Sequence, residues 1–300
     1  MSKFAGLWQY VGAVKPEIEN ALGEHLPLAP ISVSTNFNDA LHYALFPGGK
    51  RLRPVLTLLG AELVGGRRER VLTASVAVEF VHTSSLIFDD LPCMDDAMER
   101  RGKTALHQKF GEDMAVLIGL ALLNSSYGLI FAGMKDDCSA CSTVAIRAHR
   151  ELVNCIGTSG MVGGQSVDLA LTQKENLEPN QFESLRNLKT SALIRMAISL
   201  GAILSGANHK QLEALSKFSE LLGDAYQTSD DLLDLGEDLH ISQTNERRTT
   251  FALERGVEAT TARVSDFIVE AKDVLSAEFG ASKPVDLLCE LADYIGERRA

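Results

Sequence analysis

Proline is missing from two long stretches of the chain, residues 94–178 and 180–283. Proline breaks helix interiors because it lacks an amide hydrogen and its ring clashes with the preceding turn, so stretches without it permit long helices. Both stretches are rich in Ala, Leu, Glu, Lys, Arg and Gln, which are good helix formers. No run of alternating β-branched residues bounded by turn residues occurs. The sequence therefore predicts an all-α chain.

The expected helices are separated by polar, proline-containing or glycine-rich segments. They span residues 3–25, 36–45, 51–64, 68–90, 103–110, 113–134, 144–171, 180–205, 210–235, 250–278 and 284–298. The helix expected over 144–171 contains several glycines, which cost helix stability relative to alanine and would be offset by close packing. Neither a sequence repeat nor a low-complexity tract appears, so we expect a single domain over residues 1–300.

Composition and charge narrow the class of protein. With 45% hydrophobic and 23% charged residues the chain has an ordinary globular composition. A net charge of −11 argues against a general nucleic-acid surface, which would be basic. The five cysteines are odd in number and show no framework spacing, which fits a reducing compartment. The first 22 residues lack a clear signal-peptide pattern, so we expect no signal peptide and a cytoplasmic location.

Two segments leave an alternative open. Cys138 and Cys141 have the CxxC spacing of metal or redox sites, but there is no second pair, and we interpret them as part of a loop over 135–142. Residues 114–134 carry no charge over a length that could span a membrane. Polar residues at its middle favour the other interpretation, a helix at the centre of a large bundle, with no transmembrane segment.

Four carboxylates, Asp89, Asp90, Asp95 and Asp96, lie within eight residues after an apolar run. Buried acid clusters are costly unless a positive charge lies among them, and Mg²⁺ prefers carboxylates together with substrate phosphates. The Arg100-Arg101 pair that follows suits phosphate oxygens. Taken alone, such a run is more typical of a solvated helix end.

A second acidic cluster strengthens the metal hypothesis. Asp230, Asp231 and Asp234 form a DDxxD pattern, in which the first and last share a helix face with Gln227. This cluster could also be solvated when considered alone. Two such clusters in an otherwise apolar helical chain suggest a metal site between facing helices.

Basic residues form candidate anion sites. The sequence Gly48-Gly49-Lys50-Arg51-Leu52-Arg53-Pro54 places three cations at a helix start, where the backbone amides and the helix dipole favour a phosphate. It lacks the spacing of a P-loop. Lys189-Thr190 stands in an otherwise apolar helix. Each basic group alone could be a surface helix end.

Several motifs occur in a fixed order over about residues 38–251: GGKRLRP, the helix of His82, DDLPCMD with MERRGK, FGED, GMVGGQSVDL, LKTSALI and YQTSDDLLD. Together they resemble a trans-type isoprenyl diphosphate synthase of the short-chain group that makes farnesyl and geranylgeranyl diphosphate. The resemblance implies an all-α bundle around a central apolar cavity, usually a homodimer. It also implies isopentenyl diphosphate and an allylic diphosphate as substrates, and Mg²⁺ as the cofactor, about three ions per active site.

The resemblance assigns roles to residues that match its motifs. The implied metal ligands are Asp89, Asp90, Asp95, Asp230, Asp231 and Asp234. The residues implied at the allylic diphosphate are Arg100, Lys189 and Gln227, with Thr190 near the allylic carbon. Those implied in the isopentenyl diphosphate pocket are Lys50, Arg53, His82 and Arg101. The residues implied to be catalytic are Asp89, Asp90, Lys189, Gln227 and Asp230. Whether Asp95 or Asp96 supplies the third carboxylate of the first motif stays open.

The residue types fit that chemistry. Metals with Arg and Lys stabilise a departing diphosphate, and an apolar cavity keeps water from the allylic cation. In the family, bulk just before the first motif stops chain growth. Ser84 and Ser85, one helical turn before Asp89, are small, so we expect geranylgeranyl diphosphate, with farnesyl or a longer product as the alternative.

Three departures from the family pattern keep other functions open. Leu120 follows Gly119 where the family usually has an acidic residue, the segment 236–240 lacks the usual lysine, and Asp96-Ala97-Met98 replaces a more acidic stretch. The missing lysine favours a non-catalytic subunit that modulates a related synthase, whereas the two acidic motifs count against it. A terpene cyclase on the same fold is a third hypothesis, opposed by the pocket residues for isopentenyl diphosphate.

Overall fold

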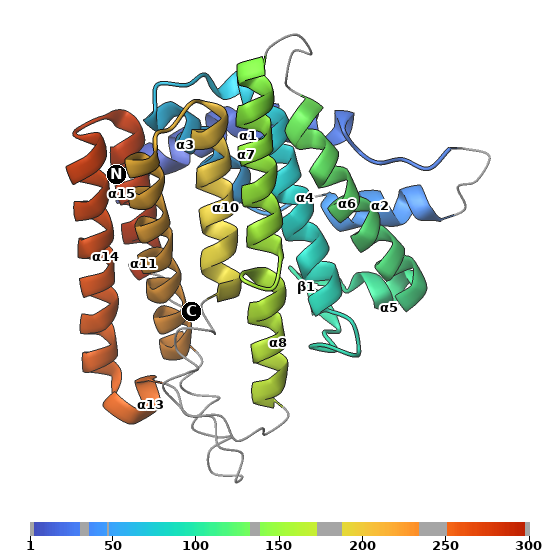
Figure 1. Ribbon diagram of the computed structural model, residues 1–300. Helices are drawn as coiled ribbons and strands as arrows, with labels where there is room; N and C mark the ends of the chain where they lie inside the picture. Colours follow the sequence, from blue (N-terminus) through green and yellow to red (C-terminus); the bar gives the residue numbers. More distant parts are fainter. Residues whose placement is uncertain are drawn as a thin grey trace. The chain divides into compact units, whose positions relative to one another are not determined.

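The computed structural model describes residues 3–30, 36–46, 48–132, 139–172, 188–233 and 251–297, and all structural statements concern these. The prediction of an all-α chain is confirmed (Figure 1). The α-helices are α1 (Ala5–Glu24), α2 (Phe37–Leu45), α3 (Leu52–Leu63), α4 (Leu72–Asp89), α5 (Leu106–Phe110), α6 (Glu112–Ala132), α7 (Ser139–Ile156), α8 (Met161–Thr172), α10 (Leu188–Leu204), α11 (His209–Leu233), α13 (Phe251–Arg255), α14 (Val257–Phe279) and α15 (Lys283–Gly296). A short 3₁₀ helix, η1 (Arg68–Arg70), precedes α4, and β1 (Glu99–Arg100) pairs with β2 (Lys103–Thr104) as a small antiparallel hairpin.

The chain forms two compact units. The N-terminal unit comprises residues 10–156 and 196–206, and the C-terminal unit comprises residues 1–9, 157–195 and 207–300. The expectation of a single domain over residues 1–300 stays a prediction.

Helix α4 is the centre of the N-terminal unit. It packs along α6 and against α3, and Figure 1 shows the hairpin beyond its C-terminal end. Almost every residue from Ala74 to Ser84 is buried, because neighbours cover α4 on several faces. Phe80, Leu58 and Ile118 are fully buried in this core. The rigid end of α4 therefore carries the first aspartate motif.

The C-terminal unit is built on two long antiparallel partners, α11 and α14, with α15 against both. Phe218 on α11, Leu275 on α14 and Leu288 on α15 are fully buried. Their burial sets the rotation of α11, whose last turns carry Gln227, Asp230 and Asp231.

Two of the expected helices are interrupted at glycine. The helix expected over 144–171 is two helices, because α7 ends at Ile156 and a turn closed by the bond from Gly160 N to Gly157 O (3.0 Å) precedes α8. The helix expected over 250–278 breaks at Gly256, whose φ of 83° is left-handed. In both places the glycines mark a helix boundary, which the proline-based argument could not detect.

Two further expectations are corrected. The loop expected over 135–142 is wrong in its second half, since α7 already begins at Ser139, and Cys138 lies outside the described residues. The short helix or turn expected over 103–110 is helical only from Leu106, because Lys103–Thr104 form strand β2, which pairs with β1.

Helix α6 is long and apolar enough to span a membrane by length and composition, with 39% of its most apolar window buried. Core helices of other proteins meet the same criteria. Ile118 and Leu122 are buried in the N-terminal unit, whereas Leu117, Leu120 and Phe131 are exposed. That α6 is a core helix and not a membrane span stays a prediction.

Candidate active site

A cavity of about 590 Å³ lies in the N-terminal unit beside the C-terminal half of α4. Its walls come from the loop between α2 and α3, from α4, and from the β1–β2 hairpin. The structure brings six of the residues singled out above to these walls: Lys50, Arg53, His82, Asp90, Arg100 and Arg101. A cavity with this many cations is suited to a diphosphate.

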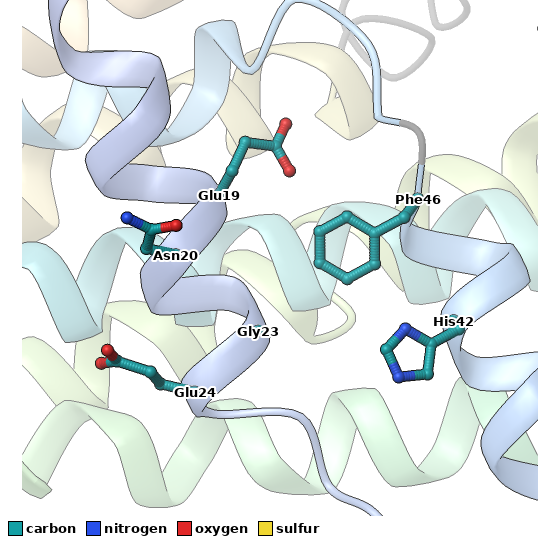
Figure 2. Close-up of a pocket in the computed structure, with 6 residues that line it drawn as sticks. All are labelled: Glu19, Asn20, Gly23, Glu24, His42 and Phe46. Atoms are coloured by element: carbon teal, nitrogen blue, oxygen red, sulfur yellow. The ribbon is translucent and has the colours of Figure 1, made fainter.

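A shallower hollow of about 530 Å³ lies between α1 and the end of α2 (Figure 2). Its lining includes Glu19, Glu24 and Phe46, and none of the site residues expected from the sequence. The candidate site is therefore the cavity beside α4.

His82 is a buried, neutral donor in the cavity wall. Burial, followed by the charges of Arg53 and Arg101, holds the pKa of His82 well below its ordinary value of 6.5. Nη2 of Arg101 lies 3.1 Å from Nε2 of His82, and because arginine only donates, Nε2 must accept and the proton must be on Nδ1. Nδ1 is buried and has no hydrogen-bond partner among the described residues. The Nδ1 proton is therefore enclosed by protein without an acceptor among the described residues, while Nε2 orients the Arg101 guanidinium.

The hairpin fixes the two arginines that follow the first motif. Arg101 and Gly102 both have positive φ, 55° and 72°, as a two-residue type I′ turn requires. Two contacts fasten the hairpin to α2: Lys103 Nζ donates to Phe46 O at 3.1 Å, and Tyr43 Oη donates to Thr104 O at 2.8 Å. The turn holds Arg101 beside His82.

The first aspartate motif folds back on itself. Asp95 N donates to Asp89 O at 2.9 Å, and Ala97 N donates to Asp90 O at 3.2 Å. Arg100 donates from Nε to Asp90 Oδ1 at 2.8 Å. This hydrogen bond, opposed by partial burial and aided by the charges of Asp90, Asp89 and Asp95, raises the pKa of Arg100. Arg100 therefore lies among three carboxylates of the motif.

The donor set of this motif suits a hard divalent cation. Asp89 and Asp90 are 7% and 4% exposed, and Asp95 is exposed. No group of three potential ligands lies close enough to enclose a metal within the residues that the structure describes. Mg²⁺ needs only one or two carboxylates when substrate phosphates and waters complete its shell. The all-oxygen donors fit a metal that arrives with a diphosphate.

The C-terminal unit holds the other predicted residues. Lys189 Nζ donates to Gln165 Oε1 at 2.5 Å, and Gln227 Nε2 donates to Thr190 Oγ1 at 2.9 Å. Helix α10 approaches α8 so closely that a Cβ on Gly164 would lie 2.7 Å from Lys189 N. The close packing expected of the glycines is thus present at this position. Two hydrogen bonds hold the start of α10 against α8 and α11.

The first two residues of the second aspartate motif, Asp230 and Asp231, lie in the last turn of α11. Asp231 is 8% exposed and Asp230 is half-buried, and both follow Gln227 by about one turn. Asp234 and residues 236–250, where the family lysine is missing, lie outside the described residues. The two motifs belong to different units, so each is described by itself.

Two residues of these sites had no signal in the sequence. Glu79 lines the cavity one turn before His82, and Gln165 holds Lys189. Glu79 is a single acid in an apolar helix, and Gln165 stands in the GMVGGQSVDL motif, whose pattern does not say which residue it meets.

Comparisons with known proteins agree with this geometry. The sequence profile described as Polyprenyl synthetase matches residues 34–247. A protein named farnesyl diphosphate synthase from Bacillus subtilis is 36% identical over 298 residues, covering 97% of this chain and 98% of the relative. A chloroplastic geranylgeranyl pyrophosphate synthase from Capsicum annuum is 37% identical, covering 87% of this chain and 71% of the relative. The crystal structure of an FPP/GFPP synthase from Zymomonas mobilis superposes with a TM-score of 0.85 at 30% identity, covering 97% of this chain and 99% of that one.

The chain belongs to the polyprenyl synthetase family. The fold of its solved relative, an isoprenoid synthase, is the all-α fold predicted from the sequence. The protein is a prenyltransferase.

Proposed function

We propose that the protein condenses isopentenyl diphosphate with an allylic diphosphate and that geranylgeranyl diphosphate is its main product. The observation that carries this proposal is the cavity beside α4, which gathers Lys50, Arg53, His82 and Arg101 next to Asp90. A diphosphate without metal needs such a set of cations and N–H donors. The relatives named above as farnesyl and geranylgeranyl synthases support the reaction class.

The two diphosphates have separate partners in the proposal. Lys50, Arg53, His82 and Arg101 bind isopentenyl diphosphate. The residues that meet the allylic diphosphate and the cation formed from it are Arg100, Lys189, Thr190 and Gln227.

The proposed metal ligands are Asp89, Asp90, Asp95, Asp230, Asp231 and Asp234. Mg²⁺, about three ions per site, would neutralise the departing diphosphate. Arg100 is placed to share this task, because it already lies among the carboxylates of the first motif. In the proposal, apolar surroundings keep water from the allylic cation that the double bond of isopentenyl diphosphate attacks. The released diphosphate takes the final proton.

Two residues of α4 support the longer product. Ser84 and Ser85 are small and lie one helical turn before the first aspartate motif; Ser84 is buried and Ser85 is half-buried. Phe88 lies instead against α6, where its ring occupies the space beside Gly119 that a Cβ would need. Its bulk is therefore packed between helices. Farnesyl diphosphate or a longer product remains the alternative, since relatives carry both names.

The test is incubation of the purified chain with Mg²⁺, isopentenyl diphosphate and dimethylallyl or farnesyl diphosphate, followed by mass analysis of the products. Formation of geranylgeranyl diphosphate is expected. Failure of the purified chain to consume isopentenyl diphosphate would overturn the proposal. Stimulation of a related active synthase by such an inactive chain would then favour the modulating subunit. Cyclised hydrocarbon products would indicate a terpene cyclase.

We further propose that the protein is a homodimer. Val116, Leu117, Leu120 and Phe131 form an exposed apolar face on α6. A second copy that covers this face would remove it from water. Light scattering on the purified chain tests this, and a monomer at micromolar concentration would contradict it. The cytoplasmic location inferred from the cysteines also stays a prediction.

A further inference from the structure

Arg51 is the central residue of the loop that carries two of the cavity's cations. It lies between Lys50 and Arg53 and immediately precedes α3. Its backbone is left-handed, with φ of 54° and ψ of 33°, a conformation that is unfavourable for residues other than glycine. Such a conformation persists only when the surrounding structure holds it, so the side-chain contacts of Arg51 are of interest.

The Arg51 guanidinium is buried and donates four hydrogen bonds. Nε and Nη2 donate to the two carboxylate oxygens of Glu19 at 2.9 and 3.0 Å. Nη1 donates to Glu79 Oε1 at 2.6 Å, and Nη2 also donates to Leu45 O at 2.7 Å. Burial opposes the charge, but the bonds to Glu19 and the charge of Glu79 outweigh it and raise the pKa of Arg51. One side chain thus ties the loop to α1, α2 and α4.

The loop is wound closely around this side chain. A Cβ on Gly48 would lie 1.9 Å from Arg51 Cζ, so a side chain there would have to displace the guanidinium and break its hydrogen bonds to Glu19 and Glu79. Glycine at position 48 lets the backbone pass over the guanidinium while these bonds stay intact. The path from Gly48 to Arg53 therefore depends on where Arg51 is held.

Arg51 also neutralises the buried carboxylate of Glu79. This carboxylate is 3% exposed and lines the same cavity as Lys50 and Arg53. An uncompensated buried carboxylate would repel a diphosphate in that cavity. The ion pair with Arg51 neutralises it, which lowers the negative potential that a diphosphate would meet in the cavity.

We infer that Arg51 is a positioning residue for isopentenyl diphosphate. Its guanidinium forms ion pairs with Glu19 and Glu79, and the second pair offsets the negative charge of Glu79 in the cavity. Through these contacts Arg51 also sets the loop path that places Lys50 and Arg53 at the cavity wall. This inference rests on the proposed function of the cavity.

Glu19 provides a test that does not alter the cavity lining. It lies on α1 and borders the hollow shown in Figure 2, facing Phe46 and the end of α2, and it is not among the residues that line the cavity beside α4. Glu19→Gln removes the bidentate partner of Arg51 and leaves Glu79 in place. Glu17→Gln is the matched control, because Glu17 is on the same helix and pairs with Arg68 at 3.0 Å.

The direction of the change in KM for isopentenyl diphosphate distinguishes a positioning role from a general electrostatic effect. Removing a negative charge from a protein that binds an anion would by itself lower KM. If Arg51 positions the loop, Glu19→Gln instead raises the KM for isopentenyl diphosphate about threefold to tenfold and leaves the KM for the allylic diphosphate unchanged. Glu17→Gln leaves both KM values unchanged or slightly lower.

The experiment measures both KM values and, by calorimetry, the affinity for inorganic pyrophosphate without metal. An unchanged or lower KM for isopentenyl diphosphate in Glu19→Gln, with unchanged pyrophosphate affinity, overturns the inference. A wild-type chain that binds pyrophosphate but consumes no isopentenyl diphosphate overturns the proposed function. In that case weaker pyrophosphate binding by Glu19→Gln still supports the positioning of an anion site by Arg51. Arg51→Lys keeps the charge but not the planar fork and is expected to resemble Glu19→Gln; wild-type affinity in both variants would also overturn the inference.

Discussion

Lys189 on α10 donates to the side-chain oxygen of Gln165 on α8 at 2.5 Å, and this bond fixes the ammonium group that is proposed to meet the allylic diphosphate. Lysine has a long flexible side chain, so an unrestrained ammonium would sample several positions. Gln165 reduces that freedom.

Gln165→Met keeps the volume of the side chain and removes the acceptor. The expected result is a decrease in kcat of about tenfold with an unchanged KM for isopentenyl diphosphate, because Lys189 would be present but poorly placed. Steady-state kinetics with both substrates varied provide the measurement. An equal loss in Gln165→Met and in Gln165→Glu, which retains an acceptor, would contradict a role through the hydrogen bond.

His82 makes the stability of the fold depend on pH. Its pKa is lowered in the folded protein, so between that value and 6.5 the unfolded chain binds more protons and stability falls as pH falls. Replacing His82 with Gln removes the contribution of this side chain to the pH dependence of stability. The slope of the unfolding free energy against pH between 5 and 6.5 should therefore decrease by up to about 1.4 kcal/mol per pH unit. Urea unfolding at several pH values measures the slope. His209, whose side chain is 88% exposed, is the control position, and an equal change in His209→Gln would refute the assignment.

Asp89→Asn and Asp230→Asn should each lower turnover by at least about a hundredfold while the far-ultraviolet circular dichroism is unchanged. The physical reason is the loss of an anionic ligand for the ion that neutralises the leaving diphosphate. Electron paramagnetic resonance of Mn²⁺ added with inorganic pyrophosphate gives a second measurement, in which the bound fraction decreases. Full activity in both variants would remove the proposed metal site.

The third carboxylate of the first motif can be identified by a matched pair. Asp95 acts electrostatically on Arg100, and its amide donates to Asp89 O, whereas Asp96 has a left-handed φ of 48°. Because Asp95 is the one of the two that interacts with Arg100 and Asp89, Asp95→Asn should weaken Mn²⁺ binding more than Asp96→Asn. Asparagine tolerates a left-handed φ as well as aspartate does, so Asp96→Asn should not disturb the backbone. The reverse order would assign the role to Asp96.

Ser85→Phe should shift the product toward farnesyl diphosphate. Ser85 is only half-buried and its hydroxyl bonds to His82 O at 2.9 Å, so it is replaceable with a smaller loss of stability than buried Ser84. Overpacking at Ser84 would cost about 1–3 kcal/mol. Mass analysis of the products with dimethylallyl diphosphate tests this. An unchanged product would place the floor of the tail channel elsewhere.

Sequence reasoning found the helices where periodicity and proline agreed, and it missed the interruptions at Gly157 and Gly256. A glycine in a helix pattern can signal close packing or a helix end, and Gly164 and Gly256 show both outcomes. Only tertiary contacts distinguish them. The same holds for the site, where cations adjacent in sequence were identified but Glu79 and Gln165 were not. Their roles arise from neighbours on other helices, and no local pattern encodes such a neighbour.

Among the residues whose backbone the structure describes, the non-glycine residues with positive φ are Arg51, Asp96 and Arg101, and all belong to the loops around the candidate site. At Arg51 a glycine would relieve the backbone strain but would leave the carboxylates of Glu19 and Glu79 without their guanidinium partner, so this strain cannot be removed without breaking a buried ion pair. For Arg51 the history of the lineage is constrained as well. A side chain at position 48 would displace the Arg51 guanidinium from Glu19 and Glu79, so we expect the glycine and the arginine to be kept or lost together among descendants.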